Sequence, residues 1–175
     1  PGYDAPPMAL QGEGEVVVVG DRTLAGEPPR LGGSEYLAQF DGADAFPALP
    51  EDPAAFVDAL AEVADADHVL ATHDVSHGGL GVALAEMVGD AGAAVELGGE
   101  GRPAEVCFHE QPGRVVLETT DAGAVTDAFE GIAPVHRIGR ADDSSDLTVT
   151  VGDEELTVAA ERIEPARGVI DRELE

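Results

Sequence analysis

The chain has 175 residues, with 36 acidic and nine basic side chains and a formal net charge of -27. Such a charge repels phosphate backbones and anionic lipids, which excludes nucleic-acid binding through a basic patch and docking on anionic membranes. No apolar run approaches the roughly 20 residues of a membrane helix, and no secretory segment opens the chain, so we expect a cytoplasmic protein.

The charge pattern also indicates the environment of the protein. All nine basic residues are arginines, and the acidic residues are spread along the chain rather than gathered in one tail. Their mutual repulsion has to be screened if the fold is to persist, so we infer a molar-salt cytoplasm. An acidic disordered chain is the alternative, but a hydrophobic content of 43% in periodic segments favours a folded protein.

Hydrophobic periodicity predicts alternating strands and helices along the chain. Strands are predicted, in chain order, at residues 16–20, 68–72, 93–97, 114–119, 135–138, 147–151 and 156–159. Helices are predicted at residues 34–40, 53–66, 79–90, 121–130 and 162–174. This order, with the last two strands as a hairpin, predicts an α/β (α+β) sandwich in which helices pack on one side of a mixed β-sheet.

Four of these helices have a predicted apolar face, and that of helix 121–130 consists of Ala122, Val125 and Phe129. Helix 79–90 follows the spacing of an amphipathic helix most closely, through Leu80, Ala83, Leu84, Met87 and Val88. Helix 53–66 is predicted to begin after Asp52 and to bury Phe56, Val57, Leu60 and Val63. Helix 162–174 is predicted to bury Ile163, Ala166, Ile170 and Leu174.

At this length a single domain is the default, and we assign it to residues 15–175. Residues 1–14 are rich in Gly and Pro and lack periodicity, which predicts an arm or linker from a preceding domain. The chain begins at Pro1 rather than at Met. We take this as an indication that it is one domain of a longer polypeptide.

The segment HDVSHGGLGVALAEM, residues 73–87, carries most of the chemical information. A predicted strand ends in a polar, glycine-rich turn and a helix begins at once. Asp74 or Ser76 can therefore cap the helix, while Gly78 and Gly79 let a ligand approach the backbone. The unpaired N–H groups of such a turn suit a phosphate. An ordinary capped turn fits as well, because the glycine patterns of P-loops and dinucleotide folds are both missing.

Two further segments repeat or extend this pattern. In LGGSEYL, Gly32 and Gly33 precede a possible capping residue, Ser34, and a short helix, so a second phosphate turn or a plain cap is predicted. In CFHEQPGRVVLE, Glu110 and Arg114 flank a Gln-Pro-Gly turn before a strand. They can form either a shared polar edge or a surface ion pair.

Other chemistries are poorly supported by the residue spacing. A zinc site would have to draw on residues that lack the close spacing of known zinc motifs, namely His73, His77, His109, Asp74 and Glu110. We therefore predict no metal site. Cys107 is the only cysteine and is predicted to be a small buried core residue.

The three motifs together resemble one family. LGGSEYL, HDVSHGGLGVALAEM and FHEQPGR before a strand occur in the order found in the last quarter of phosphoribosylformylglycinamidine synthase, the ATP-dependent synthetase subunit of purine biosynthesis. The resemblance covers essentially the whole chain and implies an AIR-synthetase-related (PurM-like) C-terminal domain. It implies an enzyme that converts formylglycinamide ribonucleotide, glutamine-derived ammonia and ATP to the amidine, ADP and phosphate, with ATP activating the formamide oxygen.

The resemblance also implies partners and cofactors. ATP and Mg²⁺ would be bound mainly by preceding domains of the same synthetase chain, so this fragment alone should be inactive. The other partners would be a glutaminase and small accessory subunits. The domain would either contribute phosphate contacts to a composite active site or serve as a non-catalytic assembly domain with at most a structural nucleotide site.

Substrate or nucleotide-phosphate contacts are implied, by motif position, at residues of all three segments. They are Gly32, Gly33, Ser34, His73, Asp74, Ser76, Gly78, Gly79, Glu110, Gly113 and Arg114. No catalytic residue is assigned. The chain departs from the family pattern at His77, His109, Gln111 and Pro112, so no side-chain role is carried over to those four positions.

Overall fold

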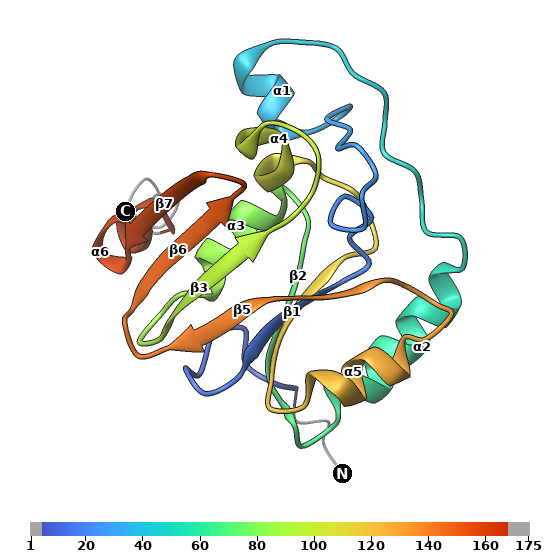
Figure 1. Cartoon of the computed structure of the whole chain (residues 1–175), viewed down its shortest axis with the longest axis vertical. Helices are drawn as coiled ribbons and strands as arrows, with labels where there is room; N and C mark the ends of the chain where they lie inside the picture. Colours follow the sequence, from blue (N-terminus) through green and yellow to red (C-terminus); the bar gives the residue numbers. More distant parts are fainter. Residues whose placement is uncertain (1–4, 168–175) are drawn as a thin grey trace, which may run out of the picture.

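A computed structural model describes residues 5–167, which fold around one seven-stranded mixed sheet (Figure 1). The strands lie in the order β2-β4-β1-β5-β3-β6-β7. Their bounds are Glu15–Val19 (β1), Val69–Asp74 (β2), Gly92–Leu97 (β3), Val115–Thr119 (β4), Val135–Asp142 (β5), Asp146–Val151 (β6) and Glu154–Ala159 (β7). The β3–β6 pair is parallel and the other five pairs are antiparallel, which makes the sheet mixed as predicted.

Six helices accompany the sheet in the described part of the chain. Their bounds are Glu35–Phe40 (α1), Pro53–Ala64 (α2), Gly79–Met87 (α3), Pro103–Phe108 (α4), Ala122–Ala128 (α5) and Ala160–Arg167 (α6). All seven predicted strands and five of these helices are therefore confirmed. Helix α4 was not predicted, and α3 ends three residues earlier than predicted. The predicted continuation of the last helix over 168–174 lies outside the described residues.

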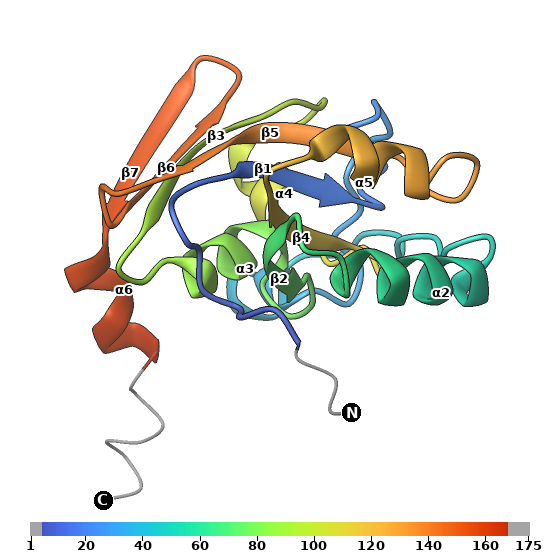
Figure 2. The same ribbon diagram turned by 90° about the horizontal axis from the view of Figure 1, so that it is seen from below.

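Helices cover both faces of the sheet, and β1 is therefore buried on both sides. Val16 and Val18 belong to the core that packs against α3. Val17 and Val19 belong to a second core built with α2 and α5. Figure 2 shows the sheet bending, with the β6–β7 hairpin at one end and α2 and α5 grouped at the other. The mixed α/β sandwich is thus confirmed, but the helices do not all lie on one side of the sheet as predicted, because α2 and α5 form a second helical layer on the other face.

The buried face of α2 differs in part from the prediction. Phe56 and Val63 are buried as expected, but Ala59 is the third buried residue and the side chain of Val57 is 59% exposed. The reason is geometric: residues 56, 59 and 63 share one stripe of a helix, and residue 57 lies about 100° away from it. Phe56 packs against Phe129, with ring centroids 5.5 Å apart.

Residues 10–14 are held against the sheet through one buried carboxylate. Glu118 of β4 is fully buried and accepts hydrogen bonds from the backbone N–H groups of Gln11, Glu13 and Gly14, at 2.6, 2.8 and 2.8 Å. Leu10 is buried and donates its N–H to the carbonyl of Met87 at the end of α3. This segment therefore belongs to the packed structure. None of the described helices is long and apolar enough to cross a membrane.

Candidate functional site

The three sequence motifs meet at one side chain, Glu110. Its Oε1 accepts the backbone N–H of Glu35, the first residue of α1, at 2.8 Å, and that of Gly78, just before α3, at 2.9 Å. In the sequence, Glu110 lies 75 positions after Glu35 and 32 positions after Gly78. Figure 1 shows α1 and α4 close together above the start of α3. The structure therefore brings the glycine-rich segments 32–35 and 73–79 together with segment 107–114.

The turn before α3 is capped differently from the prediction. Neither Asp74 nor Ser76 caps the helix: the capping position is Gly78, in the left-handed conformation with φ +78°, and no side chain of the turn bonds to the helix start. Glu110 supplies the acceptor instead, from a distant part of the chain. Asp74 and Ser76 are exposed, and Oδ1 of Asp74 lies 3.9 Å from Nδ1 of His73.

Gly79 is required by close packing. Its φ is +65°, and a Cβ at this position would meet the backbone carbonyl oxygens of His109 and Cys107, at the end of α4. Glycine alone permits both the backbone conformation and the contact. The interpretation of Gly79 as a position that solves geometry is therefore supported, while a direct approach of a ligand to it is not.

The turn before α1 is built as the sequence predicts. Ser34 is the capping residue, and its Oγ accepts the N–H of Leu37 at 3.3 Å. Gly32 donates its N–H to the carbonyl of Ala45 at 3.1 Å, and Gly33, with φ +81°, lies against the ring of Phe46. The loop that follows α1 thus folds back over both glycines.

The two histidines of segment 73–87 occupy different environments. His73 is buried on β2, with Nδ1 2.6 Å from the carbonyl of Asp74 and Nε2 3.3 Å from a carboxylate oxygen of Glu86. His77 is 84% exposed, and its Nδ1 lies 3.7 Å from Glu35 and 3.8 Å from Glu110. His77 is therefore one of the side chains that face solvent at the junction of the motifs.

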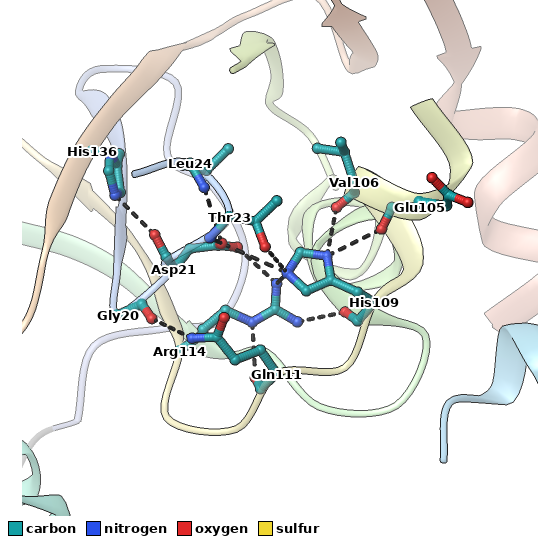
Figure 3. A network of polar contacts seen from close by, with 10 residues as sticks. All are labelled: Gly20, Asp21, Thr23, Leu24, Glu105, Val106, His109, Gln111, Arg114 and His136. Carbon is teal, nitrogen blue, oxygen red and sulfur yellow. Dashed lines mark hydrogen bonds and ion pairs between the residues drawn. The ribbon is translucent and has the colours of Figure 1, made fainter. Parts of the chain in front are cut away.

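A buried polar network fixes the strand after Glu110 (Figure 3). The guanidinium of Arg114 donates to Asp21 at 2.7 Å and to the carbonyl oxygens of His109 and Gln111 at 2.6 and 2.9 Å. Both charged side chains are almost fully buried. Arg114 thus shares no polar edge with Glu110 and forms no surface ion pair; both predicted alternatives are wrong. The guanidinium of Arg114 makes its hydrogen bonds inside the protein, and these bonds hold the turn of the third motif in place.

The neighbours of His109 define its protonated nitrogen. Nδ1 faces the carbonyl oxygens of Val106 and Glu105, at 2.9 and 3.2 Å, so it must donate. Nε2 lies 3.0 Å from a guanidinium nitrogen of Arg114 and 2.9 Å from the hydroxyl of Thr23, which both can donate to it. Nε2 also lies 3.6 Å from Oδ1 of Asp21, so both ring nitrogens have polar neighbours inside the protein. A buried, fully bonded side chain of this kind positions its neighbours rather than reacting.

The remaining turn residues complete the network. Gln111 donates from Nε2 to the carbonyl of Gly20 at 2.9 Å and is buried. Gly113 has a positive φ of 78° and packs against Pro50. Sequence reasoning missed Asp21, the central anion of this network. The available signal was its position directly after a buried β-branched strand, where a carboxylate is expected to have a specific partner.

Burial and contacts inside the network shift the pKa values of Asp21 and Arg114. Burial by itself raises the pKa of Asp21, but the contacts with His109 and Arg114 outweigh it and hold the pKa well below its ordinary value of 3.8. Burial lowers the pKa of Arg114, and the nearby charge of Asp21 opposes this. In contrast, burial raises the pKa of the Cys107 thiol to about 11, which keeps it protonated at neutral pH.

The lowered pKa of Asp21 predicts a loss of stability in acid. A carboxyl whose pKa is lower in the folded state stabilises the fold above its unfolded pKa, and this contribution disappears as the pH falls below about 4. We expect Asp21→Asn to lower the free energy of unfolding at pH 7 and to make it less dependent on pH below 4. Urea unfolding from pH 3 to 7 in molar KCl measures both. Equal pH slopes for the two proteins would contradict the assignment.

The junction of the three motifs presents a set of exposed polar side chains. Among residues 5–167 no group of three or more His, Cys, Asp and Glu side chains is arranged to hold a metal ion. The exposed polar groups at the junction are Asp74, Ser76, His77 and Glu35. They surround two glycine-rich turns whose N–H groups at Glu35 and Gly78 are already bonded to Glu110.

The fold and the converging turns define a mixed α/β sandwich domain with an edge at which three loops meet. Residues 12–152 match the family described as AIR synthase related protein, C-terminal domain, and the chain belongs to this family. It is 61% identical to the phosphoribosylformylglycinamidine synthase subunit PurL of Haloarcula marismortui, over 99% of this chain and 25% of that protein. The PurL subunit of Natronomonas pharaonis is 57% identical, over 100% of this chain and 24% of that protein.

The chain therefore spans about a quarter of the length of the curated relatives it matches. These relatives come from halophiles, in agreement with the molar-salt environment inferred from the charge. Among solved structures, PurL of Thermotoga maritima complexed with FGAR superposes with a TM-score of 0.72 at 18% identity, over 91% of this chain and 29% of that one. The same protein complexed with ATP gives 0.69 at 15% identity, over 92% and 27%. At these identities the likeness shows the fold.

Proposed function

We propose that this chain is the C-terminal domain of a phosphoribosylformylglycinamidine synthase. The observation that carries the proposal is the 61% identity to a PurL subunit across 99% of the chain, a match long enough to span the positions of all three motifs. The whole enzyme would join ammonia derived from glutamine to formylglycinamide ribonucleotide, with the cleavage of ATP to ADP and phosphate. ATP would supply the phosphoryl group that activates the formamide oxygen for displacement by ammonia.

Within that enzyme the domain would form one wall of a composite site. Solved relatives bind ATP, ADP and AMPPCP, which supports a nucleotide as a ligand of the complete protein. Mg²⁺ would accompany it, held mainly by preceding domains of the same chain. The exposed turn at Asp74 and Ser76 and the turn at Gly32–Ser34 would face the phosphate side. The isolated domain would be inactive, since most of the site lies elsewhere.

A domain exchange tests the proposal. The matching quarter of Haloarcula marismortui PurL is replaced by this chain, and the chimera is expressed in a haloarchaeal strain that lacks its own PurL. We expect growth without added purines, as with the unaltered Haloarcula protein. A chimera that accumulates to the same level but leaves the strain dependent on purines would overturn the proposal, and the empty vector sets the baseline.

The alternative, a non-catalytic assembly domain, is favoured by a different observation. An apolar groove of about 950 Å³ lies between α3, α4, the β6–β7 hairpin and α6. Its lining includes Val82, Phe108, Val149, Leu156 and Ile163. A groove of this size suits the apolar surface of a preceding domain of the same chain. Under this alternative any nucleotide held by the domain would be structural.

Substitutions in the exposed turn separate the two functions. If the domain contacts substrate phosphate, we expect Asp74→Asn or Ser76→Ala in the full-length synthetase to change the KM for ATP or for formylglycinamide ribonucleotide about tenfold, because a hydrogen bond to a charged group is worth roughly 1.5 to 3 kcal/mol. The Tm should stay the same, since both side chains are exposed. Asp58→Asn, an equally exposed change on α2, is the control. Unaltered kinetics in both turn variants would favour the assembly role.

The proposed function also implies partner subunits and a cellular compartment. A T. maritima structure of PurLQS has the same fold over 90% of this chain. We propose that the complete protein works with a glutaminase subunit and a small accessory subunit, and that it does so in the cytoplasm. The acidic surface of the domain suits a cytoplasm with molar salt.

A further inference from the structure

We propose that Glu110 is a positioning residue, whose carboxylate fixes the two glycine-rich turns relative to each other without itself contacting a ligand. This inference rests on the proposed function, since it assigns a role within the proposed phosphate-binding edge. Its basis is one oxygen atom: Oε1 accepts the N–H groups of both Glu35 and Gly78. No other described side chain bonds to the backbone of both turns.

The environment of Glu110 suits a fixed carboxylate. Its side chain is only 13% exposed, and it follows directly after His109, whose ring is fully bonded inside the protein. The backbone on its other side is held by Arg114, which donates to the carbonyl oxygens of His109 and Gln111. The carboxylate therefore projects from a rigid segment into the starts of α1 and α3.

The same contacts argue against Glu110 as a phosphate ligand. A carboxylate repels a phosphate, and here it occupies the N–H groups that would otherwise bind one. Glu110 can instead hold the turn of Gly32–Ser34 and the turn of Asp74–Ser76 at a constant separation. Hydrogen bonds weaken steeply when their geometry is lost, so a displaced turn would hold a ligand less tightly.

The use of a single oxygen makes the role testable. Because both N–H groups bond to Oε1, the carbonyl oxygen of a glutamine can replace it, so Glu110→Gln keeps both hydrogen bonds and loses the charge. Glu110→Ala loses both. In the full-length synthetase we expect Glu110→Ala to raise the KM for ATP about ten- to a hundredfold with kcat changed less than threefold, because the displaced turns would lose hydrogen bonds to the ligand. Glu110→Gln should stay within threefold of the wild type in both constants.

A second readout does not depend on activity. Hydrogen exchange of the full-length protein, followed by mass spectrometry of peptides covering 31–40 and 73–85, should be faster in Glu110→Ala and unchanged in Glu110→Gln. Asp121→Ala is the matched control, because Asp121 also bonds to the backbone at a helix start, that of α5, away from the junction. It should leave the KM and the exchange of both peptides unchanged.

Three results would overturn the proposal. If Glu110→Gln is as impaired as Glu110→Ala, the charge itself is needed. If Glu110→Ala lowers kcat at an unchanged KM, the residue only maintains the amount of folded enzyme. If exchange in both turns is unaffected by Glu110→Ala, the link is not what holds them. Should the wild-type protein form no amidine at all, the proposed function fails, and the exchange data still decide whether Glu110 holds the turns.

Discussion

Replacing Arg114 by methionine is expected to lower the free energy of unfolding by about 3 to 5 kcal/mol. The change removes one member of a buried ion pair and leaves the carboxylate of Asp21 without its charged partner. It also frees the carbonyl oxygens of His109 and Gln111 from their donor. Urea unfolding in molar KCl, followed by circular dichroism, measures the loss, and buried charges are little screened by that salt.

Arg137→Met is the matched control for this prediction. Arg137 also faces a carboxylate, Glu15, at 3.7 Å, but the pair lies at the surface. Exposed pairs contribute about 0 to 1 kcal/mol, so this variant should be close to the wild type. The double variant Asp21→Asn, Arg114→Met should be more stable than Arg114→Met, because it no longer buries a lone charge. Equal losses for Arg114→Met and Arg137→Met would mean that the buried network does not hold the fold.

Gly79→Ala is expected to cost about 3 kcal/mol of stability. A left-handed backbone costs a residue with a Cβ roughly 1 to 2 kcal/mol, and forcing extra atoms into a packed contact adds about 1 to 3 kcal/mol. Both apply at Gly79, whose φ is +65° and whose added Cβ would meet backbone atoms of residues 107–109. Thermal and urea unfolding of the variant measure the loss. A bulky residue at Gly79 would disrupt the packing of α3 on α4, so it could not report on ligand binding.

Gly131→Ala separates strain from crowding. Gly131 has a similar φ of +73°, but no other atom lies within 4 Å of the position of its Cβ. Only the cost of the left-handed backbone remains, so we expect the free energy of unfolding to fall by about 1 kcal/mol. If the two variants are equally destabilised, the contact between the start of α3 and the end of α4 is looser than the structure indicates.

The secondary structure was largely predictable because it depends on local patterns. The spacing of Leu80, Ala83, Leu84 and Met87 predicts α3, and all four side chains are buried. In contrast, α4 has only six residues, fewer than two turns, so no periodicity could reveal it. Its local signal was a Pro at its first position and a glutamate two residues later that pairs with Arg102.

The candidate site was predictable as a set of segments but not as a set of contacts. The resemblance to a family placed all three motifs, and Ser34 caps α1 as its position indicated. The bond of Glu110 to Gly78 and the pair of Asp21 with Arg114 join residues 32 and 93 positions apart. Such pairings follow from the topology of the sheet, which one sequence does not specify. For this reason the family resemblance placed Arg114 among the residues that contact a ligand, whereas its guanidinium is bonded to Asp21 inside the protein.

The buried carboxylate of Glu118 has a mechanical consequence for the longer polypeptide. It anchors the backbone at Gln11, Glu13 and Gly14, while Leu10 is bonded to the last residue of α3. A domain joined ahead of this segment would pull on the far end of α3, whose nine residues span roughly 13 Å to the turn at Gly78. A change in the position of that neighbour would therefore act first on the end of α3 opposite the turn at Gly78, because Leu10 is bonded there.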